Sequence, residues 1–191
     1  PNEWAKAEDK LTLTFTSTNG LDINATKVVF GELGEATLKF ENDLYKATLV
    51  IPKDSKYNGK VQYTITPVAD QDDVDGTQIK GSQVTGESDF VVDTIIPVIN
   101  VDKTLVVLDK DTDSYDVLSG VQGTDGEVAL TVISDGVVDF ATVGEYIVKY
   151  NTTDLAGNKA EEVSRTIRIV DRTQLQDLVN KNSNIDSSLY T

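Results

Sequence analysis

Apolar and polar residues alternate with a period of two along much of this chain. The clearest run is Leu11-Thr12-Leu13-Thr14-Phe15-Thr16, in which every apolar residue is followed by a threonine. This pattern predicts a half-buried β-strand, because successive side chains of a strand point to opposite faces. Three further strands of the same kind are expected in the first half of the chain, at residues 45–51, 61–65 and 90–92. The pair Asn58-Gly59 predicts a hairpin turn before the third of these four strands.

The alternation starts again after the segment Asp93-Thr94-Ile95-Ile96-Pro97. Strands are expected at residues 128–132, 146–150 and 163–169, and Asp135-Gly136 predicts a hairpin turn. The chain has 191 residues, which suits two β-sandwiches of ~100 residues each. We therefore expect an all-β protein with one sandwich over residues 1–93 and a second over residues 94–171. The connection is short and contains no glycine, which favours a stiff linker.

The strand at residues 146–150 has a well-defined phase. Tyr146, Val148 and Tyr150 alternate with Ile147 and Lys149. We expect the first three to point into the core of the second sandwich and Lys149 to face water.

The C-terminal residues follow a different period. Leu175, Leu178 and Val179 are spaced as on one face of a helix, and Asp171 or Thr173 is placed to cap it. The sequence therefore predicts a short helical tail over residues 172–191, as the start of a following module.

Composition excludes several classes of function. The chain has no Cys and no His, which rules out Ser-His-Asp and Cys-His nucleophiles and imidazole or thiolate zinc sites. The net charge is −15, from 32 acidic and 17 basic residues, so a nucleic-acid backbone would be repelled. The sequence has no apolar stretch long enough to span a bilayer. It starts at Pro1 and has no Met, so we expect an internal segment of a longer chain, and the lack of Cys favours a bacterial exported protein.

The second half carries a recognisable pattern. Val143-Gly144-Glu145-Tyr146-Ile147-Val148-Lys149-Tyr150 is followed by Thr153-Asp154-Leu155-Ala156-Gly157-Asn158 and then by Ile167-Arg168-Ile169-Val170-Asp171. Together with the loop Thr124-Asp125-Gly126-Glu127-Val128, these segments resemble a bacterial immunoglobulin-like family of multidomain surface proteins and carbohydrate-active enzymes. The resemblance covers residues 94–171 and implies an immunoglobulin-like sandwich.

Two weaker resemblances lie on either side. Lys10–Thr16 and Gly59–Thr66 are similar to another bacterial immunoglobulin-like repeat, although Ala69–Gly76 replaces that family's usual loop. The first strand of the repeat is missing, which implies an open sheet edge. The tail, from Leu175 to Thr191, is similar to the start of the helical FIVAR module of wall-associated proteins.

Candidate binding residues are few. Asp70, Asp72, Asp73 and Asp75 lie in one loop. Ca²⁺ takes oxygen ligands of this kind, but the spacing is not that of an EF-hand, and the favoured interpretation is a solvated acidic loop. Trp4 is the one candidate for an exposed aromatic platform that would bind carbohydrate.

A second calcium hypothesis follows from topology. In an immunoglobulin-like sandwich, the loop carrying Asp125 and the loop carrying Asp154 and Asn158 lie at the end where the chain enters. Asp93 arrives at that end from the last strand of the first sandwich. The sequence thus predicts a metal site of Asp93, Asp125, Asp154 and Asn158, with calcium as the candidate ion. The alternative is that Asp154 and Asn158 only brace their own loop.

We expect a non-catalytic spacer of an extracellular protein, secreted or attached to the cell wall, that positions a functional domain of an adhesin or carbohydrate-active enzyme. Its expected partners are neighbouring modules of the same chain. The alternative is a binding module for a glycan, a host protein or a surface-layer neighbour. An enzyme would need converging carboxylates in a cleft, and no catalytic residue is predicted.

Overall fold

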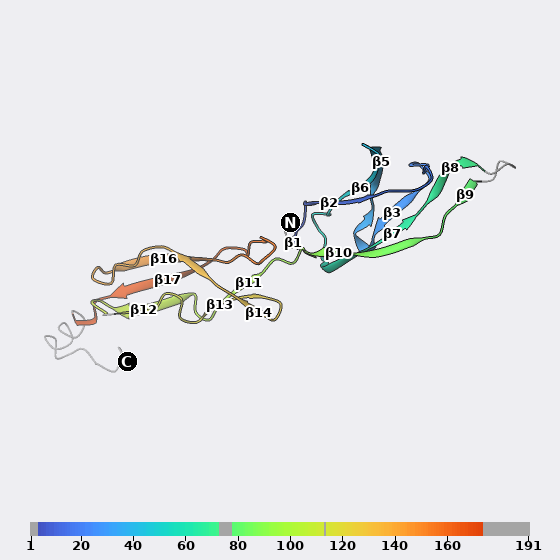
Figure 1. Ribbon diagram of the computed structural model, residues 1–191. Coiled ribbons are helices and arrows are strands. Elements are labelled where there is room, and N and C mark those ends of the chain that lie inside the picture. The colour runs from blue at the N-terminus through green and yellow to red at the C-terminus, as the bar shows by residue number, and fades with distance from the viewer. Residues whose placement is uncertain (1–3, 73–77, 113, 174–191) are drawn as a thin grey trace. The chain divides into compact units, whose positions relative to one another are not determined.

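The computed structural model describes residues 4–72, 78–112 and 114–173. These residues form an all-β structure, which confirms the predicted fold class (Figure 1). One turn of 3-10 helix, η1 (Gly31–Leu33), interrupts the strands, although no helix was expected before the tail. The predicted helix lies outside the described residues, apart from a helical turn that begins at Arg172 and Thr173.

The chain divides into two compact units. Unit 1 comprises Pro1–Ile95 together with Leu155–Asn158, and unit 2 comprises Ile96–Asp154 and Lys159–Thr191. The short segment Leu155–Asn158 groups with unit 1, which the sequence did not indicate. In the sequence, however, the segment connects two strands of the second unit.

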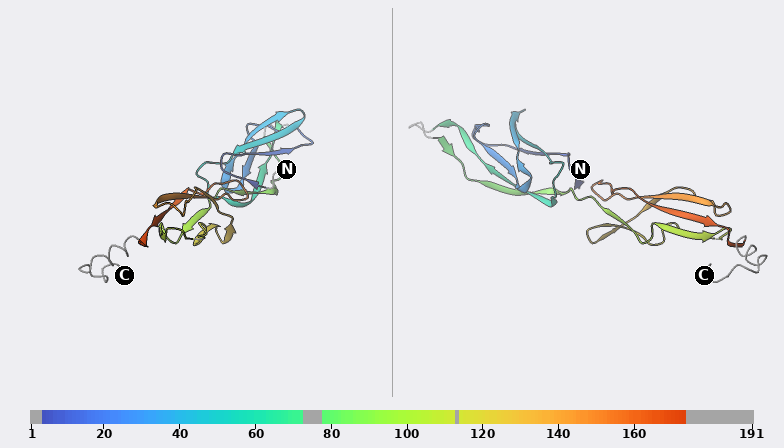
Figure 2. Two further views of the ribbon diagram at one scale, coloured as in Figure 1. Left: turned by 90° about the vertical axis from the view of Figure 1, so that its left-hand side faces the viewer. Right: turned by 180° about the vertical axis from the view of Figure 1, so that it is seen from behind.

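Unit 1 has two main sheets and a small hairpin, seen from different sides in Figures 1 and 2. One sheet has the order β1-β10-β7-β3-β4 and the other the order β2-β6-β5, with β8 and β9 paired separately. Strand β1 runs parallel to β10, and the other pairs are antiparallel. The strands are β1 (Trp4–Ala5), β2 (Lys10–Phe15), β3 (Lys27–Phe30), β4 (Gly34–Glu35), β5 (Thr37–Glu41), β6 (Leu44–Val50), β7 (Asn58–Thr66), β8 (Val68–Asp72), β9 (Gln78–Lys80) and β10 (Val84–Asp93).

Unit 2 also has two sheets. One has the order β11-β13-β14 and the other the order β12-β17-β16-β15. Strand β12 pairs in parallel with the last strand, β17, over five residue pairs from Leu105–Thr166 to Asp109–Val170. The strands are β11 (Val98–Val101), β12 (Leu105–Asp109), β13 (Val121–Asp125), β14 (Val128–Leu130), β15 (Ile133–Asp135), β16 (Gly144–Asn151) and β17 (Val163–Val170).

Each unit has a hydrophobic core of its own, built from both of its main sheets. In unit 1, Leu11 and Ala47 of one sheet join Val28, Val61 and Val92 of the other. In unit 2, Ile99 of β11 joins buried residues of β16 and β17. Both cores follow from the period-two pattern, because each apolar set lies on the inner face of its strand.

The predicted phase of residues 146–150 is confirmed. Val148 and Tyr150 are fully buried and Tyr146 packs against the same core with part of its ring exposed. Lys149 is exposed and forms an ion pair of 2.8 Å with Glu162. The hydroxyl of Tyr150 donates to the carbonyl of Val117 at 2.6 Å.

The two turn predictions were wrong. Asn58 and Gly59 begin β7 and pair with the end of β10, so the chain reverses earlier, between Pro52 and Tyr57. Of the expected strand at residues 128–132, Val128–Leu130 form β14, and the chain then passes to β15, which belongs to the other sheet. Gly136 follows β15 with a positive φ of 126°, and the chain reaches β16 only at Gly144.

Candidate functional site

Two of the four predicted metal ligands, Asp93 and Asn158, belong to unit 1. Asp93 ends β10 and is buried, with 4% of its surface exposed. One of its carboxylate oxygens accepts from the backbone N–H of Ile95 at 2.9 Å. This hydrogen bond spans two residues and stabilises a turn at the start of the linker, as Asp side chains at turns commonly do.

Asn158 belongs to unit 1, as Asp93 does. Its side-chain Nδ2 donates to the backbone carbonyl of Asp93 at 2.9 Å, and the side chain is buried. In the same unit, Lys6 donates to the carbonyl of Gly157 at 3.1 Å. The amide nitrogen of Asn158 is thus used in a structural bond, while its oxygen is the atom that a cation would take.

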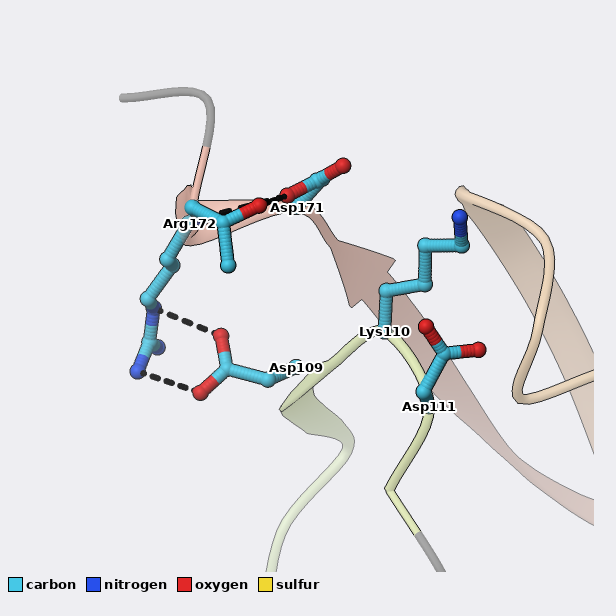
Figure 3. A pocket seen from close by; sticks show the side chains of 6 residues that line it. Asp109, Lys110, Asp111, Asp171 and Arg172 are labelled. Atoms are coloured by element: carbon cyan, nitrogen blue, oxygen red, sulfur yellow. Dashed lines mark hydrogen bonds and ion pairs between the residues drawn. The ribbon is translucent and has the colours of Figure 1, made fainter. Parts of the chain in front are cut away.

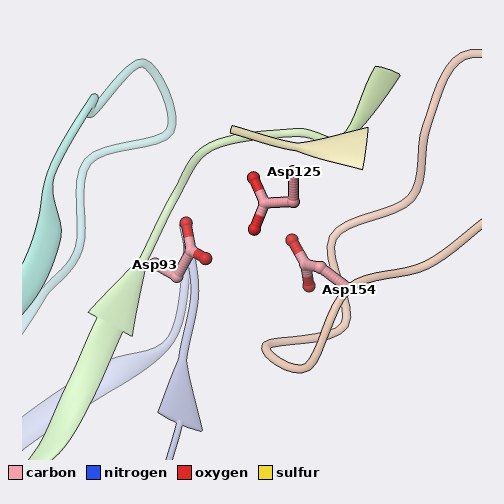
Figure 4. Close-up of side chains that lie close together, drawn as sticks. All are labelled: Asp93, Asp125 and Asp154. Carbon is pink, nitrogen blue, oxygen red and sulfur yellow. The ribbon is translucent and has the colours of Figure 1, made fainter. Parts of the chain in front are cut away.

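Asp125 and Asp154 come from different parts of unit 2. Asp125 ends β13 and Asp154 follows β16, and each offers a carboxylate oxygen within 4.8 Å of the other (Figure 4). Both side chains are partly buried. Two carboxylates at this separation repel each other, and a divalent cation would relieve the repulsion. The pair therefore has the oxygen chemistry of a hard-cation site.

The predicted ligands are divided between the units, Asp93 and Asn158 in one and Asp125 and Asp154 in the other. The single four-residue calcium site remains a prediction. Asp125, Asp154 and Asn158 each have further interactions within the protein, and the alternative that Asp154 and Asn158 only brace their own loop also remains a prediction.

The acidic loop of unit 1 is described only in part. Asp73 and Asp75 lie outside the described residues, and Asp72 ends β8, where it pairs with Gln78 of β9. The backbone N–H of Asp70 donates to the carbonyl of Gly20 at 3.2 Å. The loop thus connects the two strands of a hairpin.

Trp4 is not the fully exposed aromatic platform that the sequence suggested. It pairs with Val91 as the first residue of β1, and its side chain is partly buried. A more exposed ring is that of Phe40, 52% exposed, whose centroid lies 4.7 Å from the ring of Tyr45. Phe15 stacks on Tyr45 at 5.5 Å, so three rings form a row across β2, β6 and β5.

A depression of about 460 Å³ lies where β12 and β17 end (Figure 3). Arg172 pairs with Asp109 at 3.3 Å, and a carboxylate oxygen of Asp171 accepts from the backbone N–H of Thr173 at 3.1 Å. Both Arg172 and Asp109 are more than half exposed. Such an exposed ion pair adds little stability, and the depression combines acidic and basic groups without an apolar wall.

The most buried charged side chain was missed by the sequence reasoning. Arg165 lies in β17 in phase with Val163 and Ile167, so its position in the strand was the available signal. Its side chain is 0% exposed and forms a 2.8 Å ion pair with Asp102. It also donates to the carbonyls of Lys103 and Ser119, both at 2.8 Å. These bonds tie β17 to two loops of unit 2.

Comparison with known families identifies part of the chain. Residues 103–169 match the family described as bacterial surface protein, Ig-like domain. This match covers most of unit 2, together with the segment Leu155–Asn158 that groups with unit 1, and it confirms the resemblance recognised in the second half of the chain. No curated protein matches the chain.

Comparison with solved structures gives matches of low identity and low TM-score. The chain is 14% identical to the fibronectin(III)-like modules of Clostridium thermocellum CbhA, with a TM-score of 0.35 and coverage of 90% of this chain and 91% of that one. It is 16% identical to the structure of the M60 catalytic domain with the CBM51-1 and CBM51-2 domains of Clostridium perfringens ZmpB. There the TM-score is 0.33, and the match covers 85% of this chain and 18% of that one. Within the described residues, no helix is long and apolar enough to cross a membrane.

Proposed function

We propose that this chain is a non-catalytic structural segment of a bacterial extracellular protein, in which two immunoglobulin-like sandwiches act as spacers beside functional domains. The observation that carries the proposal is the match of residues 103–169 to an Ig-like domain of bacterial surface proteins. Two separate cores support it, since a spacer needs modules that are stable in themselves. Localisation at the cell surface or in the medium is part of the same proposal.

A binding module is the second candidate, and the aromatic row favours it. Phe40 presents about half of its surface beside Tyr45 and Phe15. Aromatic rings supply much of the contact area at recognition surfaces. The row is narrow, however, and most of the ring of Tyr45 is buried.

The spacer proposal predicts that the 191-residue chain neither cleaves nor retains polysaccharides. Reducing-sugar release tests cleavage, and affinity electrophoresis in gels that contain polysaccharide tests retention. We expect no sugar release and unchanged mobility, for the wild type and for Phe40→Ala alike. Retention that is lost in Phe40→Ala would replace the spacer with the binding module. Sugar release that disappears with a single Asp or Glu substitution would show an enzyme.

Calcium binding by Asp93, Asp125, Asp154 and Asn158 is a further part of the proposal. The short distance between Asp125 and Asp154 supports it. So does chain connectivity, because Asp154 is four residues before Asn158, and Asn158 is bonded to the backbone of Asp93. Three carboxylates and one amide oxygen, completed by water, suit an ion that takes about 6–8 oxygen ligands.

A further inference from the structure

The chain contains two pairs of asparagine followed by glycine, Asn19-Gly20 and Asn58-Gly59. In such a pair the backbone nitrogen of the glycine can attack Cγ, the carbonyl carbon of the asparagine side chain, because glycine has no Cβ that shields its backbone. The attack needs a backbone that can bend and a glycine N–H that is not held in a hydrogen bond. The structure places the two pairs in different surroundings in both respects.

Asn58 and Gly59 lie in a regular antiparallel ladder. They are the first two residues of β7, and Gly59 pairs with Val92 of β10. In the same register, the N–H of Thr94 donates to the carbonyl of Tyr57 at 3.0 Å. Hydrogen-bonded and non-bonded pairs alternate in such a ladder, so the pair of Gly59 and Val92, two positions along, is again a hydrogen-bonded one. The nitrogen that would attack Asn58 is therefore engaged in the sheet.

Asn19 and Gly20 lie in the loop between β2 and β3, and both are exposed. The N–H of Asp70 donates to the carbonyl of Gly20 at 3.2 Å, beside an isolated antiparallel bridge between Leu21 and Ala69. A hydrogen-bonded pair of this kind can form two backbone bonds. Among the described residues only the bond from Asp70 is present, and the N–H of Gly20 donates to no backbone carbonyl. The nitrogen that would attack Asn19 is therefore not held by a ladder.

We propose that Asn19 is a site of spontaneous deamidation in the folded chain, that β7 protects Asn58 from the same reaction, and that the reaction weakens the contact of the loop with β8. The nitrogen of Gly20 forms a bond to Cγ of Asn19 and the bond from Cγ to Nδ2 breaks. Nδ2 leaves as ammonia with the proton of the Gly20 N–H. Water then opens the succinimide ring. Opening at Cγ gives aspartate, and opening at the main-chain carbonyl carbon gives isoaspartate.

The product changes the surroundings of Asp70. The carboxylate of Asp70 lies directly against Gly20, in the place that a Cβ on this glycine would occupy. Deamidation puts a second negative charge on the neighbouring residue, and like charges repel. Isoaspartate also lengthens the backbone by one methylene group. The bond from the Asp70 N–H to the Gly20 carbonyl is therefore weaker in the product.

Peptide mapping by mass spectrometry, on the folded chain kept at mildly alkaline pH, measures both sites in one sample. We expect Asn19 to convert at least about tenfold faster than Asn58, because reaction at Asn58 must wait for local opening of the ladder. The product at residue 19 should include isoaspartate. The same measurement on the chain unfolded in urea is the control. There the two sites should convert at similar rates, since each asparagine is followed by glycine and neither lies in a ladder.

Asn19→Gln and Asn58→Gln form a matched pair of variants, because glutamine keeps the amide but would have to close a larger and slower-forming ring. In the folded chain, Asn19→Gln should remove most of the conversion, whereas Asn58→Gln should convert at Asn19 as the wild type does. Hydrogen exchange at the Asp70 N–H should become faster as the wild type deamidates. It should stay constant over the same incubation in Asn19→Gln.

Four results would overturn the proposal. The first is an unconverted Asn19 in the folded chain over a period in which the unfolded chain converts it. The second is equal conversion of Asn19 and Asn58 in the folded chain. The third is a product of aspartate alone, since water would then have attacked the side chain in place of the Gly20 nitrogen. The fourth is unchanged exchange at Asp70 after deamidation. None of these results depends on whether the chain is a spacer, so the two proposals can fail separately.

Discussion

At the scale of single residues, unit 2 depends on a charged side chain in its interior. Arg165 is completely buried, while its partner Asp102 is 54% exposed. The guanidinium also lies 5.8 Å from the centre of the Tyr150 ring. Its fixed fork of donors satisfies backbone carbonyls of two loops at once, which the single ammonium of lysine would do poorly.

Replacement of Arg165 by Met should destabilise unit 2 by ~3 kcal/mol or more. The carbonyls of Lys103 and Ser119 would lose their donors, at a cost of ~1–3 kcal/mol for each buried unsatisfied group. Arg168→Met is the matched control, because Arg168 lies in the same strand but pairs with Glu145 at the surface. Its cost should stay below ~1 kcal/mol. Denaturant unfolding measures both, and equal costs would contradict the structural role of Arg165.

Tyr150 makes the stability of unit 2 sensitive to alkaline pH. Burial raises the pKa of the Tyr150 hydroxyl above its ordinary value, against a smaller opposing effect of Arg165. In the unfolded chain this hydroxyl loses its proton near pH 10, while in the folded chain it keeps the proton to higher pH. The stabilisation is therefore complete below pH 10 and is lost as pH rises through the folded pKa.

Tyr150→Phe should remove this dependence. Thermal unfolding of unit 2, recorded between pH 8 and pH 11, should show a smaller fall of Tm in the variant than in the wild type. The variant also loses the hydrogen bond to Val117, which lowers its Tm at every pH. The comparison therefore uses the slope of Tm against pH and not the absolute Tm. Identical slopes would mean that other groups determine the alkaline unfolding.

At the scale of strands, the sequence predicts which face of a strand is buried better than it predicts where the strand begins and ends. In β16, the alternation of Tyr146, Val148 and Tyr150 correctly gives the buried face, because one side of the strand meets the core. Residues 128–132 also alternate, yet the chain passes there from β14 to β15 and so from one sheet to the other. Val128 is 60% exposed whereas Val132 packs against the core of unit 2, so the alternation at residues 128–132 does not mark one buried face of a single strand.

The candidate metal ligands could likewise be predicted only in part from the sequence. Asp125 and Asp154 could be placed together from loop order, because their loops follow strands of a familiar sandwich. The bond from Asn158 to the carbonyl of Asp93 joins residues 65 positions apart and uses a backbone acceptor. No residue pattern encodes such a bond, and the grouping of Leu155–Asn158 with unit 1 could not be predicted either.

At the scale of the whole molecule, the calcium proposal predicts binding that one substitution removes. Calorimetric titration of calcium should give a saturable heat with the wild type and at least ~10-fold weaker binding with Asp154→Ala, which lacks one of the carboxylate ligands. Asp54→Ala removes an exposed carboxylate elsewhere and should bind as the wild type does. Absence of binding by the wild type, or equal binding by all three proteins, would leave Asp154 with a loop-bracing role alone.

In each unit a strand near the N-terminal end pairs in parallel with the last strand, and this pairing has a mechanical consequence. Tension applied at the two ends of a unit pulls such a pair lengthwise in opposite directions, so its hydrogen bonds resist together and do not open one after another. Among the described residues, strands β12 and β17 share five residue pairs, whereas β1 and β10 share two. If the chain bears load between neighbouring modules, unit 1 is expected to yield at a lower force than unit 2.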